Sequence, residues 1–269
     1  MSENRKNVFI GIGQALSAAA GDWRKTMEFH GEVVCSLLML LKSPRKLRWS
    51  SFFYYLDICG VLAVPIVVLI CFLLGATMAF QAAIQLRDLG ASIYVADLVG
   101  FATLKEFGPL MVALIATGRA GSSFAAEIGA MKAEEEISAL TTMGINPVRF
   151  LVAPKILAMS LALPILTLLG DIASIAGGLL VGVSYLDLTA ETYLSRTCNV
   201  LSPSVLLLGI LKSWFFGIMI ALIGCREGFR SQPDSQGVGR AATSAVVRSI
   251  LWLIILDLML TMLYSAWGY

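Results

Sequence analysis

Apolar residues in this chain come in runs far longer than those of a soluble domain. The clearest run, from Ile58 to Leu86, holds 29 residues without a charge. At about 1.5 Å per residue, such a helix measures roughly 43 Å, more than the bilayer's hydrocarbon core of about 30 Å. The pattern predicts an all-α membrane protein with five transmembrane helices, near residues 55–84, 94–120, 150–184, 202–225 and 245–267.

The composition agrees with this class and excludes several others. The chain is 58% hydrophobic and 14% charged, against about 45–50% and about 25% in an average soluble domain. Its net charge of +2 gives no strong attraction for nucleic acid. The five cysteines are scattered without a C-x-x-C pair, and His30 is the single histidine, so neither a metal site nor a Ser/His catalytic pair is predicted.

Lysine and arginine predict the orientation. Of the twenty, sixteen fall in residues 1–50, 119–155 and 226–248. Because basic loops stay on the cytoplasmic side, the N-terminus is expected in the cytoplasm and the C-terminus on the far side.

The first 50 residues are expected to form a unit of their own, ahead of a five-helix domain at residues 51–269. Their apolar stretches, VFIGIGQALSAAA and EVVCSLLMLLKSP, are too short to cross a bilayer. We interpret residues 1–50 as an N-terminal interfacial amphipathic segment. The alternative is a plain polar leader. No signal peptide is predicted, because MSENRKNVF is not followed by a clear apolar region and cleavage site.

A charged segment, AEIGAMKAEEEISALTTMGINP, separates the second and third predicted spans. It predicts a short cytoplasmic helix at about 130–144, with Ala133, Ile137 and Leu140 on one apolar stripe. Gly144 suits the position after the helix, and Asn146-Pro147 prevents its continuation. A short helix held between two spans can transmit force from a soluble partner, although a solvated connecting helix would look similar.

Ionisable residues inside the spans are the other candidate chemistry, because charge in a membrane is costly. Lys105 and Glu106 precede Phe107-Gly108-Pro109, where the missing proline N–H predicts a local break lining a polar cavity. The alternative places both charges at the headgroups. Lys212 is expected to meet Glu106 or a lipid phosphate. Asp171 and Asp257 are expected to make structural contacts between helices.

The segment GRAGSSFAAEIGAMKAEEEISALTTMGINPVRFLVAPKIL resembles the signature region of the MlaE/YrbE permease family. Members of this family are membrane subunits of ABC-type lipid transporters that work with MCE-domain proteins. Other stretches, including LKEFGPLMVALIATGRAGS, SIAGGLLVGVSY and LKSWFFGIMIALIGCREGF, extend the resemblance from about Val61 to the C-terminus. The first 50 residues match only in character, and the glutamates at 134–136 are more acidic than the family pattern.

The resemblance implies a homodimeric permease subunit of a phospholipid transporter in the inner membrane of a Gram-negative bacterium. The implied partners are cytoplasmic ABC ATPase subunits, an MCE-domain protein on the periplasmic side, and a small STAS-domain protein on the ATPase. No Walker A sequence occurs in the chain, so ATP and magnesium are expected on the partner ATPase. The chain itself is expected to bind no cofactor and to catalyse no reaction. The rival interpretation is an ATP-independent membrane transporter or a scaffold subunit.

The resemblance also implies two sets of site residues. The lipid-pathway set is Met78, Gln81, Gln85, Leu86, Leu89, Lys105, Glu106 and Lys212. The ATPase-coupling set, on and beside the short helix, is Glu127, Lys132, Glu135, Glu136, Leu140 and Met143.

Overall fold

The computed structural model describes residues 24, 26–40, 42 and 48–266. Within these residues the regular structure is entirely helical. Five helical stretches are long and apolar enough to cross a membrane: Trp49–Arg87, Tyr94–Ala133, Val148–Tyr185, Pro203–Arg230 and Ser235–Ala266. They confirm the predicted all-α membrane fold with five spans.

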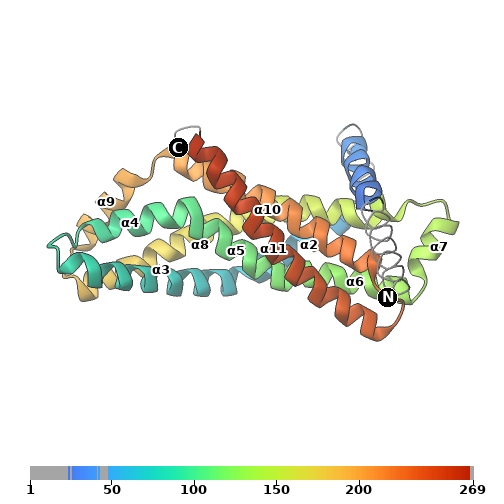
Figure 1. Cartoon of the computed structure of the whole chain (residues 1–269), viewed down its shortest axis with the longest axis horizontal. Helices are drawn as coiled ribbons and strands as arrows, with labels where there is room; N and C mark the ends of the chain where they lie inside the picture. Colours follow the sequence, from blue (N-terminus) through green and yellow to red (C-terminus); the bar gives the residue numbers. More distant parts are fainter. Residues whose placement is uncertain (1–23, 25, 41, 43–47, 267–269) are drawn as a thin grey trace, which may run out of the picture.

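The helices run largely along the long axis of the molecule (Figure 1), with α7 at one end and α9 at the other. These ends are called the α7 end and the α9 end below. In chain order the elements are α2 (Trp49–Cys59), η2 (Val61–Ala63), α3 (Val64–Arg87), α4 (Tyr94–Ala102), η3 (Thr103–Phe107), α5 (Gly108–Ala116), η4 (Thr117–Gly121), α6 (Ser122–Ala133), α7 (Glu136–Thr142), η5 (Val148–Val152), α8 (Ala153–Tyr185), α9 (Ala190–Val200), α10 (Pro203–Arg230) and α11 (Ser235–Ala266).

Helix α8 is the centre of the bundle, and it packs against α3 with almost no side chain between the two backbones. A Cβ atom at Gly75 would lie 1.9 Å from the carbonyl oxygen of Ser174, and one at Gly177 would lie 2.0 Å from that of Phe72. Small residues allow this approach, which supplies packing between helices that the lipid cannot provide. The helix continues through Pro164 without ending there.

The second span contains π-helical turns where a break was predicted. Residues Thr103–Phe107 form one π turn, and the N–H of Gly108 donates to the carbonyl oxygen of Thr103, five residues back. The wider turn absorbs the hydrogen bond that Pro109 cannot make, so the helix continues into α5. The span then runs on through a second π turn, η4, to Ala133, well beyond the predicted end at residue 120.

The short helix between the second and third spans is smaller than predicted. Residues 130–133 complete α6, and α7 covers only Glu136–Thr142. Glu135 adopts a left-handed conformation with φ of 60°. Three successive glutamates repel one another, and the negative C-terminal end of α6 disfavours them, so the single helix at about 130–144 was wrong at its start.

The end of α7 is as predicted. Gly144 has φ of 73°, and its N–H donates to the carbonyl of Thr141, while the N–H of Ile145 donates to that of Leu140. This pair of bonds is a Schellman motif, which glycine favours because it has no Cβ.

Helix α9, near the α9 end, was not predicted. Thr189 caps it by accepting a hydrogen bond from the backbone N–H of Thr192, and Tyr193 and Thr197 are its buried residues. A Cβ at Gly178 of α8 would lie 2.4 Å from the Tyr193 hydroxyl oxygen. Burial raises the pKa of Tyr193 to about 12, so this phenol stays neutral at ordinary pH.

Part of the predicted interfacial segment at residues 1–50 lies outside the described residues. Residues 26–40 are helical and expose several large apolar side chains, among them Val34 and Leu38. An interfacial position of this helix stays a prediction.

The contact between α3 and α8 can be tested with Gly177→Val. The added side chain collides with the backbone at Phe72, so we expect the free energy of unfolding to fall by about 1–3 kcal/mol. Thermal unfolding of the purified protein in detergent measures this. Gly118→Ala is the control, because a Cβ at Gly118 has no atom within 4 Å. Equal unfolding temperatures for the two variants would contradict the contact.

Candidate functional site

The strongest candidate site is a buried network around Lys212 of α10. The side chain is 1% exposed. Its ammonium forms an ion pair with Glu106, lies 2.6 Å from Oδ1 of Asp257 and donates to Oγ1 of Thr261 at 3.0 Å. The Thr261 hydroxyl also donates to Oε1 of Glu106 at 2.9 Å. Three of the five spans therefore meet at one charged point, and the predicted meeting of Lys212 and Glu106 is confirmed.

The π turn η3 positions one half of this network. Glu106 faces Lys212 across the bundle, while the adjacent Lys105 turns elsewhere and places Nζ 5.1 Å from the centre of the Phe101 ring. A π turn rotates the residues that follow it relative to a regular helix. Lys105 and Glu106 were predicted together as lipid-pathway residues, and the structure separates them.

The carboxylates of the network outnumber its ammonium. Glu106 and Asp257 face the single charge of Lys212, and both carboxylates retain partial exposure. The buried ammonium therefore has carboxylate partners from two different spans, and both carboxylates reach the edge of the bundle.

Asp171 of α8 lies beside the same π turn. It is buried, and its Oδ1 has no hydrogen-bond partner among the described residues. A Cβ at Gly108 would lie 1.8 Å from this oxygen, so the glycine after the π turn makes room for the aspartate. Thr103 and Ser174 are hydrogen-bonded nearby at 3.1 Å.

The remaining predicted lipid-pathway residues lie on the second half of α3 and the turn after it. Gln81, Gln85 and Leu89 are exposed, whereas Met78 and Leu86 pack against a small buried cluster that includes Ala82 and Val95. The five residues therefore divide into an exposed and a packed group, and their role in a lipid pathway stays a prediction.

The predicted coupling residues also divide into two groups. Glu135, Glu136 and Met143 are exposed at the α7 end. Leu140 is buried, and Lys132 donates to the carbonyl oxygens of Phe229 and Ser231 at 2.7 Å each. A docking role for the exposed group stays a prediction, whereas Lys132 attaches α6 to the end of α10.

Glu127, another predicted coupling residue, belongs to a second buried network. Lys155 is 0% exposed and lies 3.0 Å from Oε1 of Glu127, which also accepts a 2.5 Å hydrogen bond from the Tyr55 hydroxyl. Lys155 in turn donates to that hydroxyl at 2.9 Å. Helices α2, α6 and α8 meet here. Lys155 was not predicted as a site residue. It lies near the predicted start of the third span, where a lysine at the membrane surface is common.

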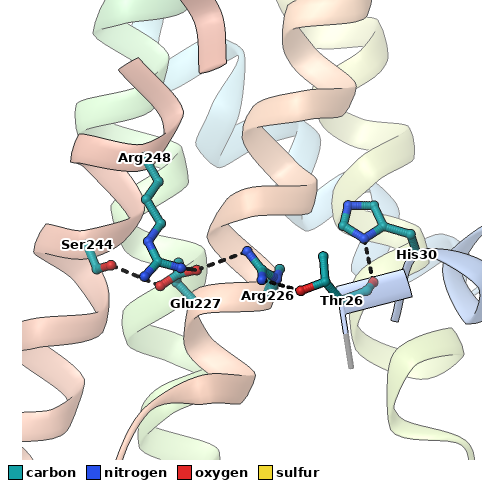
Figure 2. Close-up of polar contacts among 6 residues, drawn as sticks. All are labelled: Thr26, His30, Arg226, Glu227, Ser244 and Arg248. Carbon is teal, nitrogen blue, oxygen red and sulfur yellow. Dashed lines mark hydrogen bonds and ion pairs between the residues drawn. The ribbon is translucent and has the colours of Figure 1, made fainter. Parts of the chain in front are cut away.

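A third network joins α10, α11 and the N-terminal helix (Figure 2). Glu227 is 5% exposed and accepts hydrogen bonds from Arg248 at 2.7 Å and Ser244 at 2.9 Å. Arg226 lies 3.6 Å from the same carboxylate and donates to the Thr26 hydroxyl. Glu227 was missed because a lone glutamate among arginines looks like ordinary loop charge. The described residues contain no cluster of three or more His, Cys, Asp or Glu side chains that could hold a metal ion.

The importance of the Lys212 network can be measured with Lys212→Met. The change leaves two carboxylates facing each other without a cation, so we expect the free energy of unfolding to fall by about 3 kcal/mol. Adding Glu106→Gln to Lys212→Met should recover part of the loss, because it removes one of the uncompensated charges. Thermal unfolding of the single and double variants checks this. Additive losses would show that the two residues do not interact.

Comparison with known proteins agrees with this architecture. The family described as Permease MlaE matches residues 52–263. A probable ABC transporter permease protein of Rickettsia bellii is 35% identical over 231 residues, which cover 86% of this chain and 88% of the relative. The intermembrane phospholipid transport system permease protein MlaE of Haemophilus influenzae is 34% identical over 207 residues, covering 77% of this chain and 79% of that protein. The chain belongs to the MlaE permease family and is a permease subunit of an ABC-type transporter.

Proposed function

We propose that this permease moves phospholipid between the inner membrane and a periplasmic MCE-domain protein, using ATP hydrolysed by a separate ABC ATPase. The observation that carries the proposal is the Lys212 network, in which a buried cation and two partly exposed carboxylates join three spans. The name of the Haemophilus relative supports phospholipid as the cargo.

The energy for transport would enter through α7. Its exposed residue Glu136 and the adjoining Met143 would dock on the ATPase, with ATP and magnesium bound by that partner. Movement of α7 would reach the bundle through α6, since Lys132 holds α10 and Glu127 holds α8 and α2. The permease itself would form and break no covalent bond.

The working unit we propose is a homodimer, in which each chain supplies one α7 and half of the lipid pathway. The MCE-domain protein would sit on the periplasmic side, and a small STAS-domain protein would bind the ATPase. This arrangement places the N-terminus in the cytoplasm and the α9 end at the periplasmic surface, as the distribution of basic residues predicts.

Docking through α7 can be tested by co-purification with the ATPase. Glu136→Lys and Met143→Glu should each reduce the amount of ATPase that remains bound by about tenfold, because each change disturbs an exposed contact of α7. Glu191→Lys is the matched control, since Glu191 is an exposed glutamate in the first turn of α9 at the opposite end. Unchanged binding in both α7 variants would exclude α7 as the docking helix.

Transport itself can be measured with fluorescent phospholipid in vesicles that contain the permease and ATPase, with the MCE-domain protein as acceptor. Transfer should require ATP, and Glu106→Gln should slow it about tenfold, the effect of losing about 1.4 kcal/mol of interaction. Transfer that proceeds equally without ATP would favour an ATP-independent transporter. Bound ATPase that hydrolyses ATP but moves no phospholipid would overturn the proposed cargo.

A further inference from the structure

A second cluster of basic residues lines a cleft at the α7 end, apart from the Lys212 network. The cleft lies where α10 ends and α11 begins, and has a volume of about 290 Å³. Its walls include Arg230, Ser231, Arg240, Ser244 and Arg248. A shallower hollow continues from it along α11 past Val247.

The buried carboxylate of Glu227 organises one side of this cleft (Figure 2). It holds Arg248 through a single nitrogen, Nη1, and Ser244 through its hydroxyl. A guanidinium carries five N–H donors in a planar fork. Because the bond to Glu227 uses only one nitrogen of Arg248, the rest of its fork is available to an anion in the cleft.

Arg240, two turns before Arg248 on the same face of α11, is similarly arranged. Its Nη2 atom donates to Oε1 of Gln232 at 2.7 Å and lies 3.7 Å from a carboxylate oxygen of Asp234. Nη1 and Nε take no part in these contacts. Among the ionisable residues of the cleft wall, three arginines face one glutamate, so the lining carries a net charge of +2.

Ser231 adds an independent indication of a ligand. The residue is 6% exposed, it lines the cleft, and its Oγ has no hydrogen-bond partner among the described residues. A buried hydroxyl without a partner is costly, and an anion in the cleft would supply an acceptor. The carbonyl of Ser231 is held by the Lys132 ammonium at 2.7 Å, which brings a further positive charge close by.

The outer face of α11 shows what kind of molecule would carry the anion. Arg240, Ser244 and Arg248 recur at intervals of four, and Leu251 and Ile255 continue the same stripe. Val247 is 62% exposed and Leu251 55%. The stripe therefore changes from basic to apolar along one helix face, as a headgroup and an acyl chain would require.

We propose that this cleft binds the phosphate of an anionic phospholipid from the adjoining leaflet. Arg240 and Arg248 hold the phosphate, the Ser231 hydroxyl donates to it, and an acyl chain lies along Val247 and Leu251. The positive lining favours lipids with net negative charge over zwitterionic ones. This site is separate from the Lys212 network, and its occupancy does not depend on phospholipid being the transported cargo.

The test is a lipid titration of the purified, delipidated full chain, followed by native mass spectrometry. The probes are dioleoylphosphatidylglycerol, dioleoylphosphatidylcholine and inorganic phosphate. Phosphatidylglycerol should bind about tenfold more tightly than phosphatidylcholine, and Arg240→Gln should weaken it about tenfold, as expected for a lost charge-assisted hydrogen bond. Arg149→Gln is the control, because Arg149 is a solvent-accessible arginine that lines a different cleft.

A further variant separates a lipid from free phosphate. Leu251→Ser should weaken phosphatidylglycerol several-fold and leave competition by inorganic phosphate unchanged. Two results together would assign the cleft to free phosphate and overturn the lipid proposal. Inorganic phosphate at low millimolar concentration would abolish the binding of phosphatidylglycerol, and Leu251→Ser would leave that binding unchanged.

If Arg240→Gln and Arg149→Gln weakened the binding of phosphatidylglycerol equally, that binding would depend only on general surface charge, and this result would also overturn the proposal. The proposal would also be overturned if Arg240→Gln released the ATPase and the chain showed no preference for phosphatidylglycerol over phosphatidylcholine. The cleft would then be a contact with the ATPase. Unfolding temperatures of all variants confirm that they are folded. Because none of these variants changes Glu106, failure of this inference leaves the transport measurement untouched.

Discussion

Buried charge must be compensated within the bundle, and this constraint determines how the helices are joined. Lys155, Lys212 and Glu227 are each almost fully buried, and each meets an opposite charge on another helix. A charge left without such a partner in hydrocarbon would cost several kcal/mol. The three networks therefore require particular pairs of residues to meet, whereas one apolar side chain can replace another at the lipid-facing surface.

These networks also explain the division between what the sequence predicted and what it did not. The five spans followed from hydropathy, because a bilayer admits only long apolar helices with satisfied backbones. The pairing of Glu127 with Lys155 did not follow, because charge alone does not reveal which residues meet across the bundle. Glu127 was assigned to a docking surface because the family resemblance implied a coupling helix beside it, and its contact with Tyr55 lies 72 residues away in the chain.

Local chemistry was predictable where one residue type determines the backbone. Gly144 ends α7 in the expected left-handed conformation, and Pro109 marks an irregular turn. The form of that turn was not predictable, since a proline can be accommodated by a break, a kink or a π turn. Asp171 of the distant helix α8 lies against Gly108 in this turn, and the local sequence does not reveal that contact. The formation of α9 also depends on tertiary packing, because its buried residue Tyr193 lies against the glycines of α8.

The positions of the networks suggest how the permease divides its tasks. Helix α6 carries α7 at its C-terminal end, and its contacts through Glu127 and Lys132 lead to α8 and to the end of α10. One of the two carbonyls that Lys132 holds belongs to Ser231, which also lines the basic cleft. A displacement of α6 would therefore change the cleft wall directly, and an anion bound there would resist that displacement by joining α10 to α11. In this protein, the same few polar contacts that stabilise the bundle would also carry the motion from α7 to the lipid-facing helices.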